Sequence, residues 1–338
     1  MRFSDEKKRS IQFYILEKIA QKTAGVYKFV ADTFGISPST VHSYLLELQE
    51  RDVIRKTKRD QYELVTQEYH YHLKRSEGQL NSDTYAYEHC LEEHVQALSA
   101  EIQQIWDYAL SEMANNVMDH SAAENLYIRV QQNYLQTRVV LLDDGVGIFR
   151  KIMEYFSLPD LETAKCELFK GKLTTDSANH SGEGIFFTSK MMDTFLILSD
   201  GILFTVGKFD EEMTIHFKDA AAQGTCVQMQ LSNFSNKTAR GIFDRYSDVE
   251  GGFTTTRLPL KHFFDSAPVS RSQAKCICNR LEQFQEVILD FEDLEWMGQG
   301  FAHQLFVVYQ NQHPTVKLRP VHMNESVAKM YHHVTHTD

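Results

Sequence analysis

The sequence has no long hydrophobic run and no recognisable leader. No stretch of its 338 residues approaches the roughly 20 apolar residues that a membrane-spanning helix needs. The first residues show no apolar run followed by a small-residue cleavage site, as a secretory signal would. We therefore expect a cytoplasmic protein with no membrane partner.

Cysteine is scarce and unpaired in the sequence. The chain has five cysteines, an odd number, and no Cys-x-x-Cys. Cys276 and Cys278 are two residues apart in the sequence. Their side chains would not share one face of a helix, and they are poorly placed to bind one metal ion together. We expect reduced thiols and no structural zinc site.

Two familiar nucleotide-binding signatures are missing. Gly-x-x-x-x-Gly-Lys-Ser/Thr occurs nowhere. The chain does contain two Gly-x-Gly pairs, Gly145/Gly147 and Gly182/Gly184, but they are too far apart to form a dinucleotide-binding fingerprint. The sequence therefore argues against both P-loop and Rossmann-type sites.

Only the start of the chain carries a net positive charge. The net charge is −11, yet residues 1–65 hold 12 Lys/Arg against 9 Asp/Glu, while the rest holds 23 against 37. An acidic body with a mildly basic N-terminal part suits a protein that contacts nucleic acid through that part only.

Residues 1–66, which we call the head, predict three helices and a hairpin. Apolar spacing places a first helix after Ser4 and a second over 26–34. Gly35 fits a tight turn, and Ser37 with Pro38 fits the start of a third helix that ends near Asp52. Residues 53–64 are typical of a small basic hairpin.

The phrase FGISPSTVHSYLLELQERDVIRK resembles the recognition half of bacterial winged helix-turn-helix regulators. The resemblance implies double-stranded DNA as a partner, with one group of side chains facing the major groove or phosphates: Ser39, Thr40, His42 and Ser43. A second group would grip the backbone as a wing: Arg55, Lys56, Lys58 and Arg59. Because a net charge of +3 gives weak binding to DNA, we expect a homodimer. The alternative is a winged helix that docks protein.

The middle of the chain carries polar residues in a particular order. Glu112 and Asn116 are four apart in a helical pattern over 85–120, so they share a face. After two predicted strands, 126–131 and 138–142, comes Asp143 with Gly145 and Gly147. A second Gly-x-Gly opens a helix near 184, where free N–H groups favour phosphate, and Gly224-Thr225 then enters a strand.

This order resembles the GHKL superfamily of ATP-binding domains, the Bergerat fold, over about residues 88–232. The resemblance implies ATP and Mg²⁺ as ligands, with Asn116 holding the metal, Asp143 binding the adenine amino group and Glu112 acting as the general base. It implies further cofactor contacts from Asp119, Gly145, Gly147, Lys172, Gly182, Gly184 and Thr225. Segment 149–180, which contains Lys172, resembles the mobile ATP lid of this family.

A glutamate at position 112 favours hydrolysis of ATP, or transfer to Ser or Thr, over histidine autophosphorylation, because many histidine kinases have an amide at the corresponding position. His120 lies inside the Asn116 motif and is interpreted as structural. Typical general-base assistance is about 10²–10⁴-fold.

The remaining residues alternate strands and helices. Strands are predicted at 253–258, 287–291 and 316–321, with helices at 270–284, 300–309 and 325–334, which indicates a small α/β layer. The run from Val287 to Phe301 resembles the core of STAS-like domains. Gly298, Gln299 and Gly300 stand where phosphorylated STAS domains carry Ser or Thr, so we expect docking of a protein partner or dimerisation rather than a phosphoswitch.

Together these patterns predict an α+β multidomain protein: a winged helix-turn-helix, a Bergerat α/β sandwich and a small STAS-like α/β domain. The expected boundaries are a head at 1–66, a linker at 67–84, an ATP-binding domain at 85–232, a connector at 233–252 and a STAS-like domain at 253–338. The first functional hypothesis is an ATP-binding, ATP-hydrolysing regulator whose nucleotide state gates DNA binding. The alternatives are an anti-sigma-type Ser/Thr kinase acting on a STAS-like or sigma-factor partner, and a slow ATPase in a larger assembly.

Overall fold

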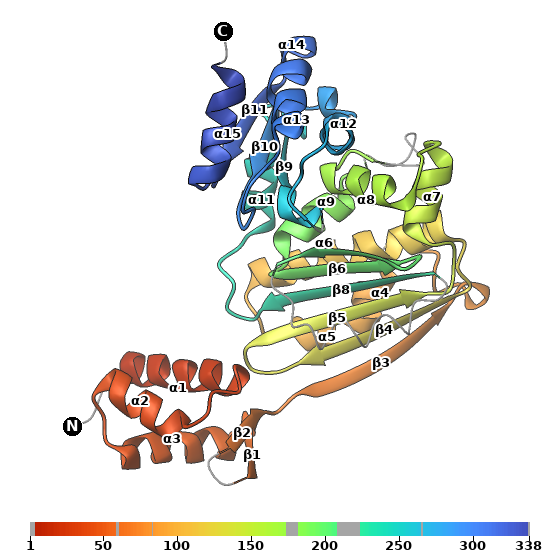
Figure 1. The fold of residues 1–338 in the computed structure, drawn as a ribbon. Helices are drawn as coiled ribbons and strands as arrows, with labels where there is room; N and C mark the ends of the chain where they lie inside the picture. The colour runs from red at the N-terminus through yellow and green to blue at the C-terminus, as the bar shows by residue number, and fades with distance from the viewer. Residues whose placement is uncertain are drawn as a thin grey trace. The chain divides into compact units, whose positions relative to one another are not determined.

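The structure is a computed structural model that describes residues 4–58, 61–82, 84–173, 182–207, 224–264 and 266–336. It is an α+β fold with several sheets (Figure 1). Two compact units make up the chain. The first comprises Met1–His70, Arg129–Val139 and Gln230–Ser235, and the second comprises Tyr71–Ile128, Val140–Met229 and Asn236–Asp338.

The head has the predicted three helices and hairpin, which are α1 (Asp5–Ala20), α2 (Val26–Phe34), α3 (Pro38–Glu50), β1 (Ile54–Lys58) and β2 (Gln61–Leu64). Ser4 caps α1 by accepting from Lys7 N, and Ser37 caps α3 by accepting from Thr40 N. The two strands pair antiparallel. The apolar faces of all three helices meet in one core that includes Ile15, Val30 and Leu45.

Two segments distant in sequence complete the first unit. Leu135, in the turn before β5, packs against the core of the head. Phe234 makes an edge-on contact with Phe13, with ring centroids 5.1 Å apart. Arg51 lies over the ring of Tyr134 at 5.8 Å. The turn at 133–135 and the segment at 230–235 thus belong with the head.

The largest sheet has six strands in the order β3-β4-β5-β8-β6-β7. Its strands are β3 (Gln67–Lys74), β4 (Asn125–Gln132), β5 (Gln136–Asp143), β6 (Thr194–Ser199), β7 (Ile202–Val206) and β8 (Thr225–Ser232). We expected a linker at 67–84, but residues 67–74 form the edge strand β3. The sequence does not indicate this strand, because Leu73 is its one buried residue. An edge strand can have so little buried surface because one of its sides faces solvent.

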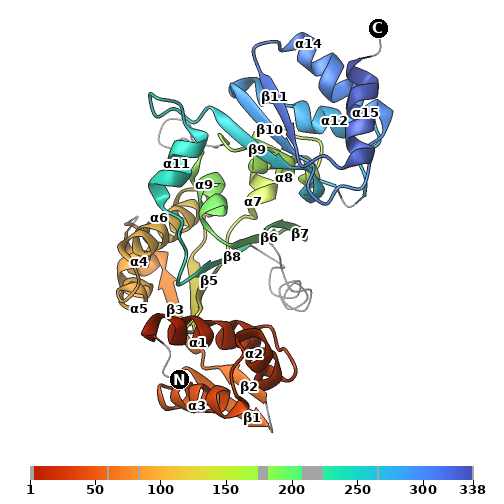
Figure 2. The same cartoon turned by 90° about the vertical axis from the view of Figure 1, so that its left-hand side faces the viewer.

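Three helices cover one face of the sheet, where we expected a single helix over 85–120 (Figures 1 and 2). They are α4 (Tyr85–Cys90), α5 (Glu92–Val95) and α6 (Ala100–Asn116). The backbone of Leu91 leaves the helical region between α4 and α5, and Ser99 starts α6 by accepting from Ile102 N. Trp106, fully buried, anchors α6. A π-helical turn, Val117–Ser121, extends α6 toward β4.

Segments 148–191 and 233–252 contain further helices, namely α7 (Ile148–Tyr155), α8 (Leu161–Lys170), α9 (Gly184–Met191) and α11 (Ala239–Tyr246). The predicted connector at 233–252 therefore contains a helix, whose Ile242 and Tyr246 are buried. Residues 174–180 of the segment that resembles a lid lie outside the described residues.

The C-terminal part has a parallel three-stranded sheet in the order β11-β10-β9. Its strands are β9 (Thr255–Pro259), β10 (Glu286–Asp290) and β11 (Lys317–Val321), close to the predicted ranges. Helices on one face of this sheet (Figure 2) include α12 (Arg271–Cys278), α13 (Gln299–His303), the π-helix Gln304–Tyr309, α14 (Gln310–Gln312) and α15 (Glu325–Thr335). Short 3₁₀ turns lie at Arg75–Glu77, Leu260–His262 and Leu281–Gln283.

No helix within the described part of the chain combines the length and the apolar character that crossing a bilayer requires.

Candidate functional site

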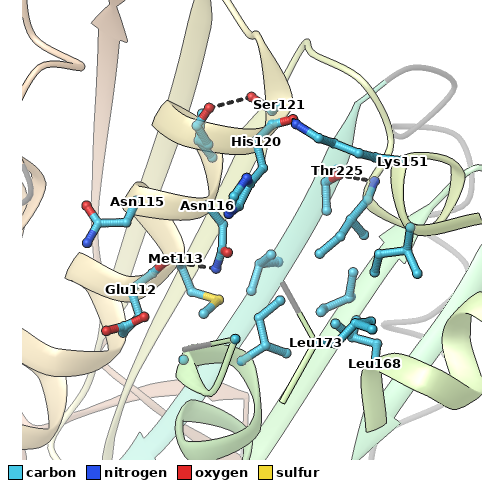
Figure 3. Close-up of a pocket in the computed structure, with 18 of the residues that line it drawn as sticks. Glu112, Met113, Asn115, Asn116, His120, Ser121, Lys151, Leu168, Leu173 and Thr225 are labelled. Atoms are coloured by element: carbon cyan, nitrogen blue, oxygen red, sulfur yellow. Dashed lines mark hydrogen bonds between the residues drawn. The ribbon is translucent and has the colours of Figure 1, made fainter. Parts of the chain in front are cut away.

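A pocket of about 270 Å³ lies in the second unit (Figure 3). Its lining comes from segments far apart in the sequence: α6 with its π-helical turn, the end of β5, α7 and α8, the start of α9, and β6 and β8. Six residues singled out from the sequence line it: Glu112, Asn116, Asp143, Gly182, Gly184 and Thr225. The volume is close to the lower end of the range for small-ligand pockets, about 300–1,000 Å³.

Glu112 and Asn116 sit one helical turn apart on α6. The Asn116 side-chain amide, Nδ2, donates to the backbone oxygen of Glu112 at 2.8 Å, which orients the side chain (Figure 3). A Cβ added at Gly184 would lie 1.9 Å from Glu112 Oε2. Glycine at 184 therefore lets the first turn of α9 approach the carboxylate. Negative charge at Glu112 and Glu183 adds to burial in raising the pKa of the nearby Tyr108.

Asp143 ends β5 with its side chain buried; only 4% of the residue is exposed. Its Oδ1 accepts from Gly145 N at 2.9 Å. Burial raises the pKa of the carboxyl to about 6, and backbone N–H donors of Gly145 and Thr225 oppose part of that rise. A carboxylate in this setting is costly to ionise without a donor, so a ligand that donates a hydrogen bond is favoured.

Hydroxyl groups beside Asp143 connect β6, β8 and the start of α7 through hydrogen bonds. Ile148 N donates to Thr225 Oγ1 and to Ser199 Oγ, both at 3.1 Å. Ser199 Oγ donates to Gly224 O at 2.9 Å. Gly224 has a φ of +86°, and a Cβ there would lie 2.0 Å from the backbone oxygen of Asp143. Glycine therefore lets the start of β8 pass close to the end of β5.

Several lining residues had no signal in the sequence. Lys151 on α7 donates from Nζ to the backbone oxygen of His120, and both residues line the pocket (Figure 3). Burial lowers the pKa of Lys151. His120, which the sequence indicated as structural, also lines the cavity. Leu168 and Leu173 add apolar wall from α8 and the segment after it. These positions follow from how α7 and α8 pack, which no local pattern specifies.

Four predicted cofactor residues do not line the pocket. Gly145 and Gly147 flank it, between Asp143 and α7. Asp119 is exposed on the π-helical turn. Lys172 points to the C-terminal part of the chain, where its Nζ donates to Gln283 O at 3.1 Å and lies 5.1 Å from the ring centroid of Phe284.

The predicted DNA-contacting residues lie at the start of α3 and on the hairpin. Hydroxyls cluster at the N-terminus of α3, where Ser37 Oγ is 2.7 Å from Ser39 Oγ and 2.9 Å from Thr40 Oγ1. His42 stacks on Tyr27 and hydrogen-bonds its hydroxyl at 3.2 Å, and Ser43 is exposed.

On the hairpin, Arg55 pairs with Glu63, whereas Lys56 and Lys58 are exposed. Arg59 lies outside the described residues.

A second group of polar residues gathers at the carboxyl ends of β10 and β11. Asp290, Glu292 and His322 have ligand atoms within 4.8 Å of one another. Arg257 already donates to Asp290 Oδ2 from Nε at 2.9 Å, and His322 Nδ1 lies 2.8 Å from Oδ1. Arg257 therefore balances the charge of the one buried carboxylate in the group, which leaves little need for a cation.

Comparison with known proteins identifies part of the C-terminal region. Residues 273–328 match the family described as STAS-like domain of unknown function (DUF4325). The match spans α12, β10, α13 and β11 and ends within α15, and it agrees with the resemblance drawn from Val287–Phe301. No curated protein matches the chain. The chain therefore contains a STAS-like domain, and the match does not extend to the head or to the domain with the pocket.

Proposed function

We propose that the protein binds ATP with Mg²⁺ in the pocket of the second unit, in a GHKL-type domain with the Bergerat fold. The observation that carries the proposal is the meeting of four segments in one cavity. Glu112 and Asn116 come from α6, Asp143 from β5, Gly182 and Gly184 from the start of α9, and Thr225 from β8. Their order in the sequence and their convergence are independent facts, since order alone does not bring residues together.

The donors and acceptors around the cavity suit a nucleotide. Asp143 offers a buried carboxylate to the adenine amino group, and Thr225 lies beside it. The first N–H groups of α9, at Gly184 and beyond, favour phosphate oxygens at the other end of the cavity. Lys151 adds a positive charge to the pocket wall.

The metal site fits the residues present. Mg²⁺ prefers oxygen ligands, and it would neutralise the phosphates when bound. Asn116 Nδ2 donates to Glu112 O, and the side-chain oxygen of Asn116 would be the metal ligand. Glu112, on the same helical face, is the candidate base that takes a proton from the attacking water.

The head is proposed as a winged helix-turn-helix that binds double-stranded DNA as a homodimer. Its support is the hydroxyl cluster at the N-terminus of α3 together with exposed Lys56 and Lys58 on the hairpin. Hydroxyls, helix N-termini and lysines are groups that contact DNA phosphates. Nucleotide binding would then alter how the head holds DNA, which requires different affinities in two states.

A second candidate function is a Ser/Thr protein kinase of the same superfamily. The observation that favours it is the direct packing of the STAS-like α12 against α8, whose Leu168 lines the pocket. A STAS-like protein partner would occupy a similar position. Transfer of label from γ-labelled ATP to a serine or threonine of a partner supports this candidate, whereas release of free phosphate without protein labelling rules it out.

Calorimetric titration with Mg-ATP tests the main proposal. The full chain should bind one nucleotide, and Asp143→Asn should remove binding because an amide nitrogen would face the adenine amine. The matched control is Asp107→Asn, an exposed aspartate on α6, which should bind like the unmodified chain. Normal affinity in Asp143→Asn would show that the adenine contact is misassigned.

A further inference from the structure

The contact between α8 and the STAS-like domain contains a buried ionic network. Lys170 and Glu167 are each 1% exposed, and Lys170 Nζ lies 2.8 Å from Glu167 Oε1. The same ammonium donates to the backbone oxygens of Cys276 at 2.8 Å and Asn279 at 2.7 Å. Asn279 Nδ2 returns a hydrogen bond to Glu167 at 2.8 Å. Two helices more than 100 residues apart in sequence are therefore held in fixed register.

This register brings two cysteine thiols together. Cys166 is four residues before Lys170, so both face the same side of α8. Cys276 is the residue whose carbonyl Lys170 binds, on α12. Each of the two thiols is a cause of the other's pKa shift, so the pair is coupled across the contact. Cys166 is buried and Cys276 is partly exposed, so one member of the pair is open to a reagent in solution.

We propose that Cys166 and Cys276 are a thiol modification site that hydrogen peroxide converts to a reversible disulfide linking α8 to α12. The Cys276 thiolate attacks a peroxide oxygen, which gives a sulfenic acid and hydroxide, and the hydroxide takes up the proton that the Cys276 thiol released and becomes water. The Cys166 sulfur then attacks the sulfenic sulfur, the S–S bond forms, and water leaves with the proton of Cys166. Two thiols and one peroxide become one disulfide and two waters, and a thiol reductant such as glutathione reverses the reaction.

The surroundings assign the two cysteines different roles in this chemistry. The hydrogen bond from Cys166 lowers the pKa of Cys276, and the positive charge of Lys170 lowers it further, so this thiol is the better source of thiolate. The pKa of Cys166 is raised by its hydrogen bond to Cys276 and by burial. Because Cys276 is also the partly exposed member of the pair, it is the site of first attack, and the buried Cys166 is the resolving thiol.

The cross-link would restrain one wall of the pocket. Leu168 lies two residues after Cys166 on α8 and lines the pocket. The disulfide would add a covalent bond to the network at Lys170, so α8 would separate from α12 less often. This consequence concerns the α8–α12 contact and does not depend on which ligand occupies the pocket.

Trypsin digestion under non-reducing conditions tests the site, because cleavage after lysine and arginine isolates both cysteines. Cys166 falls in the peptide CELFK and Cys276 in CICNR, which also carries Cys278. After peroxide treatment of the full chain and blocking of free thiols, we expect these two peptides joined and two of the five thiols lost. Dithiothreitol should restore both thiols.

Two serine variants and one exchange measurement decide the result. Cys276→Ser should abolish the joined peptide, whereas the matched control Cys278→Ser should keep it; both positions leave the buried Cys166 in place. Amide hydrogen exchange over α8 should slow after oxidation of the unmodified chain and stay unchanged in Cys276→Ser. Five free thiols after peroxide treatment, or a joined peptide that survives in Cys276→Ser, would overturn the proposal.

Discussion

At the scale of single residues, the pocket contains a carboxyl group whose burial makes ionisation costly, and a glycine at which one helix comes very close to another side chain. Asp143 is almost fully buried, and Gly184 brings α9 against the Glu112 carboxylate. Burial disfavours the ionised form of Asp143 when no ligand is bound. Both residues place an acceptor or a donor where a nucleotide would use it. Sites for binding and catalysis commonly contain such perturbed groups.

Asp143→Asn should stabilise the folded protein while removing nucleotide binding. The rise of the Asp143 pKa from 3.8 to about 6 corresponds to about 3 kcal/mol at neutral pH. The native state binds the proton more tightly than the unfolded state. Stability from this group therefore falls as pH rises from 3.8 to about 6 and is level above. We expect a gain of about 1–3 kcal/mol at pH 7 in denaturant unfolding. A loss at pH 7 would contradict this account of Asp143.

Nucleotide affinity should depend on the same ionisation. Below about pH 6 the carboxyl of Asp143 is increasingly protonated in the free protein and cannot accept from the adenine amine. The dissociation constant for Mg-ATP should therefore rise as pH falls below 6, by about tenfold per unit at the steepest. Titrations between pH 5 and pH 8 check this, with guanine nucleotides as a comparison. A dissociation constant that does not change over this range would argue against an ionised acceptor.

Glu112→Gln should leave nucleotide binding intact and lower the rate of ATP hydrolysis by about 10²–10⁴-fold. The amide keeps the size of the side chain against Gly184 but cannot take a proton from water. Phosphate release measures the effect. Glu101→Gln, an exposed position in the first turn of the same helix, is the control and should hydrolyse like the unmodified chain. Equal rates in both variants would remove Glu112 from the role of base.

Pocket residues could be predicted from the sequence where a suitable side chain lies in the expected order of motifs. Glu112, Asn116, Asp143 and Thr225 stand in a recognisable sequence of motifs, and all line the pocket. Lys151 was missed, and His120 was not assigned to the pocket, because their positions depend on how α7 packs against the π-helical turn. Lys172 was expected to contact the cofactor, yet it lies against Phe284 and Gln283, because its direction is set by contacts with residues more than 100 positions away in the sequence.

At the scale of elements, α8 has two contacts with different chemistry. Leu168 belongs to the pocket, and Glu167 and Lys170 belong to the ionic network with the STAS-like domain. The sequence shows α8 only as part of a segment that resembles a lid. In the sequence, Glu167 and Lys170 have the spacing of an exposed ion pair on a helix. Their burial comes from contacts of α8 with α12 and β9, which the local sequence does not show.

Lys170→Met should destabilise the second unit by about 3–5 kcal/mol, because it leaves Glu167 buried with less compensation. The double variant Lys170→Met/Glu167→Gln should cost less than the sum of the two single variants. Denaturant unfolding of all four proteins gives the coupling energy. Arg240 and Asp244 form an exposed pair at 3.6 Å and serve as the control, with coupling below about 0.5 kcal/mol. Additive effects at Lys170 and Glu167 would contradict a coupled network.

Helix and strand boundaries were predicted well where the sequence contains clear helix-capping residues. They were predicted poorly where an element forms because of tertiary packing. Ser37, Pro38 and Gly35 mark the α2–α3 turn, and the structure has it there. The strand β3 and the helix α11 were missed, because β3 is an edge strand with little apolar alternation and α11 lies in a polar stretch. The strand β10 was found because Val287–Leu289 form a short apolar run, which is typical of a buried strand in a parallel sheet.

At the scale of the whole molecule, strands β5 and β8 contribute residues to both units. Residues up to Val139 of β5 belong with the head and later residues with the pocket, and β8 divides after Met229. Asp143 and Thr225 are in the parts of these strands that belong to the second unit. Covalent continuity of this kind is one route by which a ligand in one unit biases the other, and the gating proposed above requires such a route.

Replacing Lys56 and Lys58 together by alanine should weaken binding of double-stranded DNA and reduce its salt dependence. Each lysine that neutralises a phosphate contributes about 0.9 to the slope of log affinity against log salt, so the four lysines that the homodimer loses should lower the slope by about 4. Gel shifts over a range of salt measure this. Lys329→Ala, an exposed lysine on α15, should leave the slope unchanged. An unchanged slope in the Lys56/Lys58 variant would favour a head that docks protein.

The central claim is that one cleft holds adenine at Asp143 and a metal at Asn116. A crystal structure of the full chain with Mg²⁺ and a non-hydrolysable ATP analogue measures this most directly. We predict the adenine amino group within about 3 Å of Asp143, the metal on the side-chain oxygen of Asn116 and the phosphates at the start of α9. An empty cleft in crystals grown at saturating analogue, or a nucleotide bound elsewhere, would contradict the account.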